Sequence, residues 1–156
     1  MSNSYKTVLP KYNSDRNYLL RDGFNQLKQD MGFTQIRFYC FKKTTGRVFH
    51  IMTNKNAKGA NVVKYFTTSD TMPVACNSFT RLPDDKSLLA QNCDQWGYPT
   101  NDRWGHQSHV NDKRLFTRPL AWAATRFYRP TGNVPQCDDK SSNPMSVGDI
   151  WQIFVR

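Results

Sequence analysis

All twelve acidic residues of this 156-residue chain are aspartates, and the chain contains no glutamate. It also contains thirteen asparagines. Glutamate favours helix interiors, whereas Asp and Asn side chains hydrogen-bond to nearby backbone groups and therefore favour helix caps and turns. The composition predicts a domain built mainly of strands and loops, and it removes glutamate as a catalytic acid or base.

The chain has the length of one ordinary domain. Its aromatic content of 13% argues against disorder, because disordered chains contain few aromatic residues. No linker, repeat or low-complexity segment divides the chain. We therefore predict a single domain over residues 1–156, with residues 1–12 as a tail or an edge strand.

One amphipathic helix is predicted near the N-terminus. Ser14 or Asp15 can cap this helix, and Gly32 can end it. The apolar residues of its buried stripe recur at helical spacing and are Leu20, Phe24, Leu27 and Met31.

A hairpin is predicted over residues 34–52. Apolar and polar residues alternate over 34–41, a turn follows over 42–47, and a second apolar run covers 48–52. We expect a third strand over 62–67. Residues 150–155 are apolar on both faces, which is typical of a central strand buried on both sides. The predicted fold class is α+β, mostly β, with an antiparallel sheet or sandwich, one N-terminal amphipathic helix and long disulfide-linked loops.

The four cysteines are Cys40, Cys76, Cys93 and Cys137, and no two of them form a C-x-x-C pair. This spacing excludes the usual zinc-ribbon and thioredoxin motifs. An even number of widely separated cysteines is typical of two disulfides in an oxidising compartment, with three connectivities open. The alternative is four buried thiols in a cytoplasmic protein.

We expect an extracellular protein. No apolar run approaches the ~18 residues that a membrane span requires. The first thirty residues lack the basic head and apolar middle of a secretory signal. The extracellular prediction therefore requires a signal that is not part of this sequence, and the alternative location is the cytoplasm.

Basic and aromatic residues alternate in the second half of the chain. The net charge is +10, and residues 103–129 carry Lys and Arg against the single acid Asp112. Aromatic rings stack on sugars, Asn and Asp bond hydroxyls, and Arg pairs with anionic groups. We therefore predict a secreted, non-enzymatic module that recognises glycans or other anionic polymers. Its expected binding site is the loop between Cys93 and His109, which we call the Cys93–His109 segment. The expected ligand-binding residues are Trp96, Tyr98, Asn101, Asp102, Arg103, Trp104, His106 and His109. The alternative for each aromatic is burial.

A second function class comes from the segment D-R-W-G-H-Q at residues 102–107. It resembles the D-R-G-H-Q signature of the DNA/RNA non-specific nucleases, with Trp104 inserted between Arg103 and Gly105. The resemblance implies that His106 is the general base of a metal-dependent nuclease. It also implies that Asn133 or Asn143 holds a Mg²⁺ ion, with nucleic acid as the substrate.

Two further alternatives remain open. Asp94, Asp138 and Asp139 could supply oxygen ligands to Ca²⁺, or they could be solvated turn residues; no other cofactor is expected. The aromatic segment could instead bind a protein partner, which would make the chain a matrix or adhesion domain.

Overall fold

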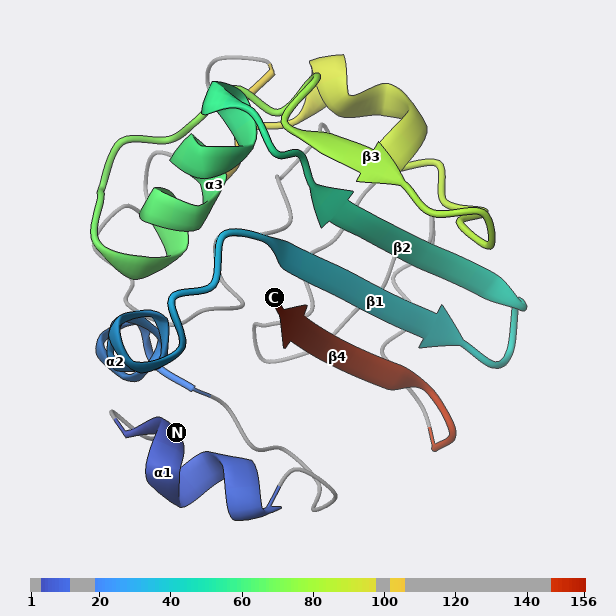
Figure 1. Ribbon diagram of the computed structural model, residues 1–156. Helices are drawn as coiled ribbons and strands as arrows, with labels where there is room; N and C mark the ends of the chain where they lie inside the picture. The colour runs from blue at the N-terminus through green and yellow to red at the C-terminus, as the bar shows by residue number, and fades with distance from the viewer. Residues whose placement is uncertain (1–3, 12–18, 98–101, 106–146) are drawn as a thin grey trace.

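The computed structural model describes residues 4–11, 19–97, 102–105 and 147–156 (Figure 1). In chain order the elements are helix α1 (Tyr5–Val8), the 3₁₀ turn η1 (Leu9–Lys11), helix α2 (Arg21–Met31), strands β1 (Ile36–Lys42) and β2 (Arg47–Thr53), helix α3 (Ala57–Thr67), strand β3 (Phe79–Arg81), the 3₁₀ segment η2 (Ala90–Gln95) and strand β4 (Ile150–Val155).

The strands form one antiparallel sheet in the order β3-β2-β1-β4. The β1–β2 hairpin confirms the hairpin prediction, with Phe38 paired to Ile51 and Cys40 to Phe49. The four-stranded sheet with its helices agrees with an α+β fold (Figure 1).

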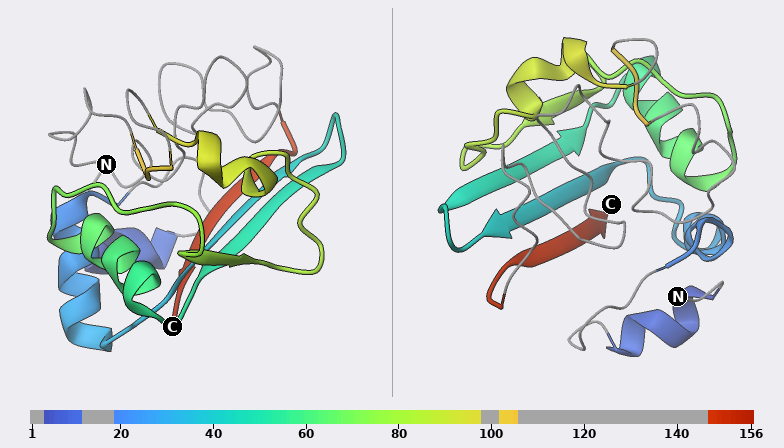
Figure 2. Two further views of the ribbon diagram at one scale, coloured as in Figure 1. Left: turned by 90° about the horizontal axis from the view of Figure 1, so that it is seen from above. Right: turned by 180° about the vertical axis from the view of Figure 1, so that it is seen from behind.

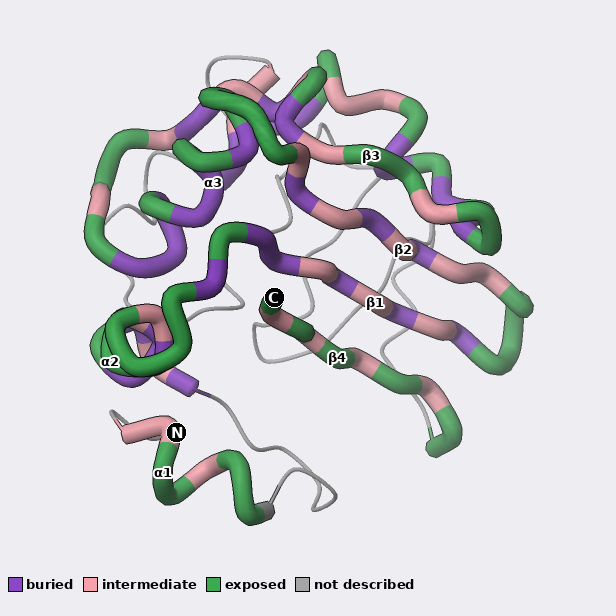
Figure 3. The backbone as a smooth tube through the Cα atoms, viewed as in Figure 1, coloured by how far each residue is buried: buried purple, intermediate pink, exposed green. Residues whose placement is uncertain are grey.

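One face of the sheet is buried and the other is partly open. Buried and half-buried residues alternate along β1 and β2 (Figure 3). Helices α2 and α3 and the η2 segment lie on the buried side (Figure 2). The inner-face residues include Ile36, Phe38, Cys40, Phe49 and Ile51. We call the opposite surface, which bears Arg37, Tyr39, Phe41, Val48, His50, Met52, Ile150, Gln152 and Phe154, the outer face.

Helix α2 confirms the predicted N-terminal helix but uses only part of the predicted stripe. Phe24 and Leu27 are buried, and Gly32 ends the helix in the left-handed conformation at φ 66°. Met31 is 58% exposed, so the last residue of the predicted stripe is not part of the core. Helix α2 begins at Arg21 with Leu20 as its N-cap, so the prediction that Ser14 or Asp15 caps it was wrong.

Residues 62–67 form the second half of helix α3, so the prediction of a third strand there was wrong. The side chain of Asn56 caps the helix by accepting a 2.8 Å hydrogen bond from the amide of Gly59. Gly59, Val62, Val63 and Phe66 are all buried. Their i, i+3, i+4, i+7 spacing is helical, and it outweighed the strand preference of the valines.

Gly59 lets helix α3 approach the end of β2. A Cβ atom at this position would overlap the backbone carbonyl of Asn54. Only glycine provides this close approach of two backbone segments.

Strand β4 is an edge strand among the described strands, not the central strand that the sequence predicted. Ile150 and Phe154 are 42% and 37% exposed on the outer face. Exposed and half-buried residues alternate along β4, so its outer-face residues are exposed and its inner-face residues are half-buried.

Residues 5–11 are helical, which differs from the tail or edge strand expected for residues 1–12. The hydroxyl of Tyr5 donates a hydrogen bond to the carboxylate of Asp30 in α2. This hydrogen bond raises the pKa of the Tyr5 phenol above its ordinary value. Within the described residues, no helix is both long and apolar enough to span a membrane.

Candidate functional site

Trp96 and Trp104 are fully buried, which corrects the expectation that they form an exposed binding surface. Each has an exposed fraction of 0%. The two indoles meet edge to face at 4.9 Å, and Phe79 stacks on Trp96 at 5.0 Å. Trp104 also contacts Phe38 of β1 at 5.5 Å between ring centroids. These rings fill the space under the sheet and cannot stack on an external ligand.

The indole N–H groups of both tryptophans have internal partners. Trp96 Nε1 donates to the carbonyl of Leu89 at 2.8 Å, and Trp104 Nε1 donates to Ser78 Oγ at 2.8 Å. A buried Trp usually satisfies its N–H in this way. Both contacts assign these residues to the core.

Asp102 and Arg103 hold the chain that leads into Trp104. Asp102 has a positive φ of 60°, and its Oδ1 accepts hydrogen bonds from the amides of Ala75 and Cys76 at 3.1 and 2.7 Å. Arg103 is half-buried and forms an isolated antiparallel bridge with Val74. The Asp102 carboxylate therefore organises a turn, which differs from the hydroxyl-binding role predicted for it.

A disulfide joins Cys76 to Cys93, with a Cα–Cα distance of 5.2 Å. It connects η2 to the turn that Asp102 caps. Cys40, on the inner face, is also disulfide-bonded. The remaining cysteine, Cys137, lies outside the described residues.

Several predicted site residues also lie outside the described residues, namely Tyr98, Asn101, His106, His109, Asn133, Asp138, Asp139 and Asn143. The nuclease assignment of His106 and Asn133 stays a prediction. Asp94 is exposed. Among the residues that the structure describes, no three His, Cys, Asp or Glu side chains gather into a group that could hold a metal ion.

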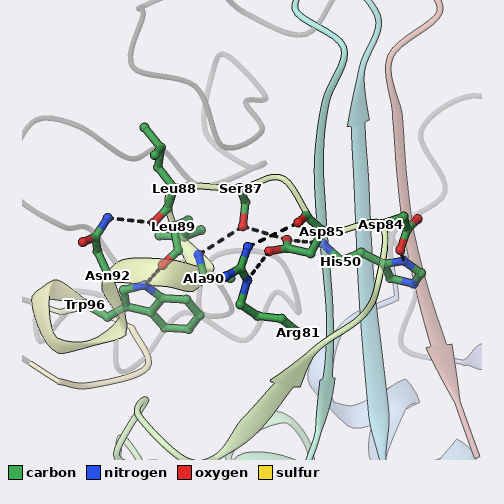
Figure 4. A network of polar contacts seen from close by, with 10 residues as sticks. All are labelled: His50, Arg81, Asp84, Asp85, Ser87, Leu88, Leu89, Ala90, Asn92 and Trp96. Atoms are coloured by element: carbon green, nitrogen blue, oxygen red, sulfur yellow. Dashed lines mark hydrogen bonds and ion pairs between the residues drawn. The ribbon is translucent and has the colours of Figure 1, made fainter.

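A polar network that the sequence did not predict surrounds Asp85 (Figure 4). The carboxylate of Asp85 accepts hydrogen bonds from the amide of His50 at 2.9 Å, from Ser87 Oγ at 2.7 Å and from Arg81 Nε at 2.6 Å. Its side chain is completely buried. The network fixes the segment after β3 against β2.

The neighbouring Asp84 contacts the imidazole of His50. Its Oδ1 lies 2.6 Å from His50 Nδ1, and its side chain is 55% exposed. His50 Nε2 is buried and has no hydrogen-bond partner in the described part of the chain. The ring of Tyr39 meets the imidazole edge to face at 5.0 Å. His50 is thus a packed residue of the outer face whose imidazole pairs with the carboxylate of Asp84.

The outer face ends in a pocket beside the C-terminal residues of β4. The pocket has a volume of about 290 Å³ and is lined by Gln35, Arg37, Met52, Phe154, Val155 and Arg156. Two of these six side chains are guanidinium groups and none is acidic. Arg37 and Phe154 are directly opposite each other on β1 and β4, and Met52 of β2 is opposite Arg37 on the other side.

The side chain of Arg37 is stacked but otherwise has no partner in the described part of the chain. Its Cζ lies 3.9 Å from the centre of the Phe154 ring. No hydrogen bond or ion pair joins its guanidinium to another described residue. Arg156 Nε donates to Gln35 Oε1 at 3.0 Å. We call the surface formed by Arg37, Phe154 and Arg156 the arginine pocket.

Comparison with protein-family models, with curated proteins and with solved structures finds no match to this chain.

Proposed function

We propose that the protein is an extracellular, non-enzymatic module that binds an acidic glycan or another anionic polymer. One observation carries this proposal. Arg37 and Arg156 line a pocket beside an aromatic ring, and none of the described residues that line this pocket is acidic. Such a surface attracts a ligand group that is negatively charged and has an apolar neighbour. The proposed site therefore moves from the Cys93–His109 segment to the outer face of the sheet.

The charge of the whole chain supports the same class of ligand. The net charge is +10, and residues 31–69, which include β1, β2 and α3, carry seven Lys or Arg and no acid. A field of this sign accelerates and strengthens the encounter with a polyanion, and salt screens it.

The disulfide supports the extracellular part of the proposal. Cys76 and Cys93 are bonded, and such bonds persist mainly in oxidising compartments. The matrix or adhesion role stays a prediction, since no described contact favours a protein ligand over a polymer.

We expect the wild-type protein to be retained on immobilised heparin at low salt and to elute as NaCl rises. Replacing both pocket arginines, Arg37→Ala with Arg156→Ala, will weaken binding about a hundredfold or more, because each of the two lost charged hydrogen bonds contributes about 1.5–3 kcal/mol. Elution salt and a dissociation constant from calorimetry measure the change.

The matched control is Lys55→Ala with Lys64→Ala, which also removes two positive charges. Both lysines are exposed and lie outside the arginine pocket. We expect this control to shift elution much less. Equal shifts in the two double variants would show that only net charge matters, and no retention of the wild type would refute polyanion binding.

A further inference from the structure

We infer that the arginine pocket binds one oxyanion group, a carboxylate or a sulfate, through the N–H edge of Arg37 while Phe154 covers the face of its guanidinium. This inference rests on the proposed function and specifies the ligand of the same site. It requires an arginine at position 37, not merely a positive charge.

The contact with Phe154 orients Arg37 before any ligand binds. At 3.9 Å the guanidinium carbon lies against the ring, and the two residues are cross-strand partners in the sheet. Because a stacked guanidinium uses its face for the ring, its N–H donors at the edge remain available. These donors match two oxygens of one anionic group. A side chain that is already held in place loses less entropy on binding.

The position of Arg37 makes its charge effective. Arg37 is half-buried, and no described carboxylate neutralises it. A charge at a partly desolvated surface interacts more strongly with an incoming anion than a fully solvated charge does. Arg156 adds a second cation, which Gln35 holds at 3.0 Å. Gln35 is itself 4% exposed and donates to the carbonyl of Thr53 at 2.5 Å.

The rest of the pocket indicates what is attached to the oxyanion. Met52, Phe154 and Val155 are the apolar residues among those that line the pocket. A volume of about 290 Å³ is at the lower limit of small-molecule sites. The fitting ligand is therefore an anionic group carried on a ring or another partly apolar body, as in an acidic sugar residue.

The test replaces Arg37 with lysine, which keeps the positive charge but removes the planar guanidinium group with its paired N–H donors. We expect Arg37→Lys to weaken binding about tenfold, nearly as much as Arg37→Ala, because an ammonium cannot reproduce bidentate, stacked binding. The control is Arg103→Lys, a half-buried arginine of the Cys93–His109 segment, which should leave the dissociation constant unchanged. Melting temperatures verify that each variant is folded.

Three polymers separate the sources of the oxyanion: dextran sulfate carries sulfate alone, hyaluronan carries carboxylate alone, and neutral dextran is the blank. We expect one or both acidic polymers to bind and neutral dextran not to bind. If the wild type binds an acidic polymer and Arg37→Lys binds it equally well, the inference is wrong and the proposed function stands. If the wild type binds neither acidic polymer, the proposed function itself fails.

A second variant keeps the inference testable if Arg37→Lys does not fold. Phe154→Leu retains an apolar side chain at the edge strand and removes the ring under Arg37. We expect its affinity for the same polymer to fall several-fold. Unchanged affinity in a folded Phe154→Leu protein would contradict the role of the stacked ring.

Discussion

Trp104→Ala is expected to lower the free energy of unfolding by about 3–5 kcal/mol, the usual range for removing a large aromatic side chain from a core. Trp104 is fully buried and contacts the rings of Phe38, Phe66 and Trp96. The substitution also leaves Ser78 Oγ without its 2.8 Å donor. Chemical denaturation followed by circular dichroism measures the loss.

Met31→Ala is the control for this substitution, because Met31 is a large apolar residue that is 58% exposed. It should cost less than about 1 kcal/mol. A loss from Trp104→Ala as small as that of the control would contradict the buried position of Trp104. It would restore the expectation that this tryptophan belongs to a surface.

Asp85→Ala is expected to cost about 2–4 kcal/mol of unfolding free energy. The change removes the acceptor for the amide of His50, for Ser87 Oγ and for Arg81 Nε. Burying donors without an acceptor costs about 1–3 kcal/mol each, and the Arg81 contribution is reduced because its side chain is 41% exposed.

Asp84→Ala supplies the comparison, since it removes the same group from the adjacent residue. The side chain of Asp84 is 55% exposed. Within the network, its carboxylate contacts the imidazole of His50. We expect a cost below about 1 kcal/mol, as for exposed ion pairs. Similar losses from the two variants, measured by denaturation at the same pH, would show that burial of Asp85 does not stabilise the fold.

Local patterns in the sequence predicted two local features correctly, the β1–β2 hairpin and the end of helix α2. The hairpin followed from alternation over β1 and β2, and the end of α2 followed from Gly32, which needs a left-handed backbone. Both features depend on residues close together in the chain. Helix α3 was missed because two valines, a tyrosine and a phenylalanine suggested a strand. The helical spacing from Gly59 to Phe66 was the signal that would have corrected this prediction.

The positions of the tryptophans depend on contacts between distant segments. Trp104 and Phe38 are far apart in sequence, and a polar loop around Trp104 gave no sign that the ring turns into the core. The sequence leaves burial open as the alternative for each aromatic. For Trp96 and Trp104 that alternative is correct.

The arginine pocket was only partly predictable. The alternation over residues 34–41 implies that residues two apart lie on the same side of the strand, and Arg37 and Tyr39 do share the outer face. The partner of Arg37, however, comes from β4, at the other end of the chain. No local pattern specifies a pairing of such high sequence separation, so the contact with Phe154 could not be predicted.

Titrating ¹⁵N-labelled protein with an acidic oligosaccharide tests the position of the binding site most directly. We predict that the largest amide shift changes will occur at Arg37, Met52 and residues 154–156, while residues 93–97 and 102–105 change little. Largest changes in those two segments, with the end of β4 unaffected, would contradict the assignment of binding to the outer face.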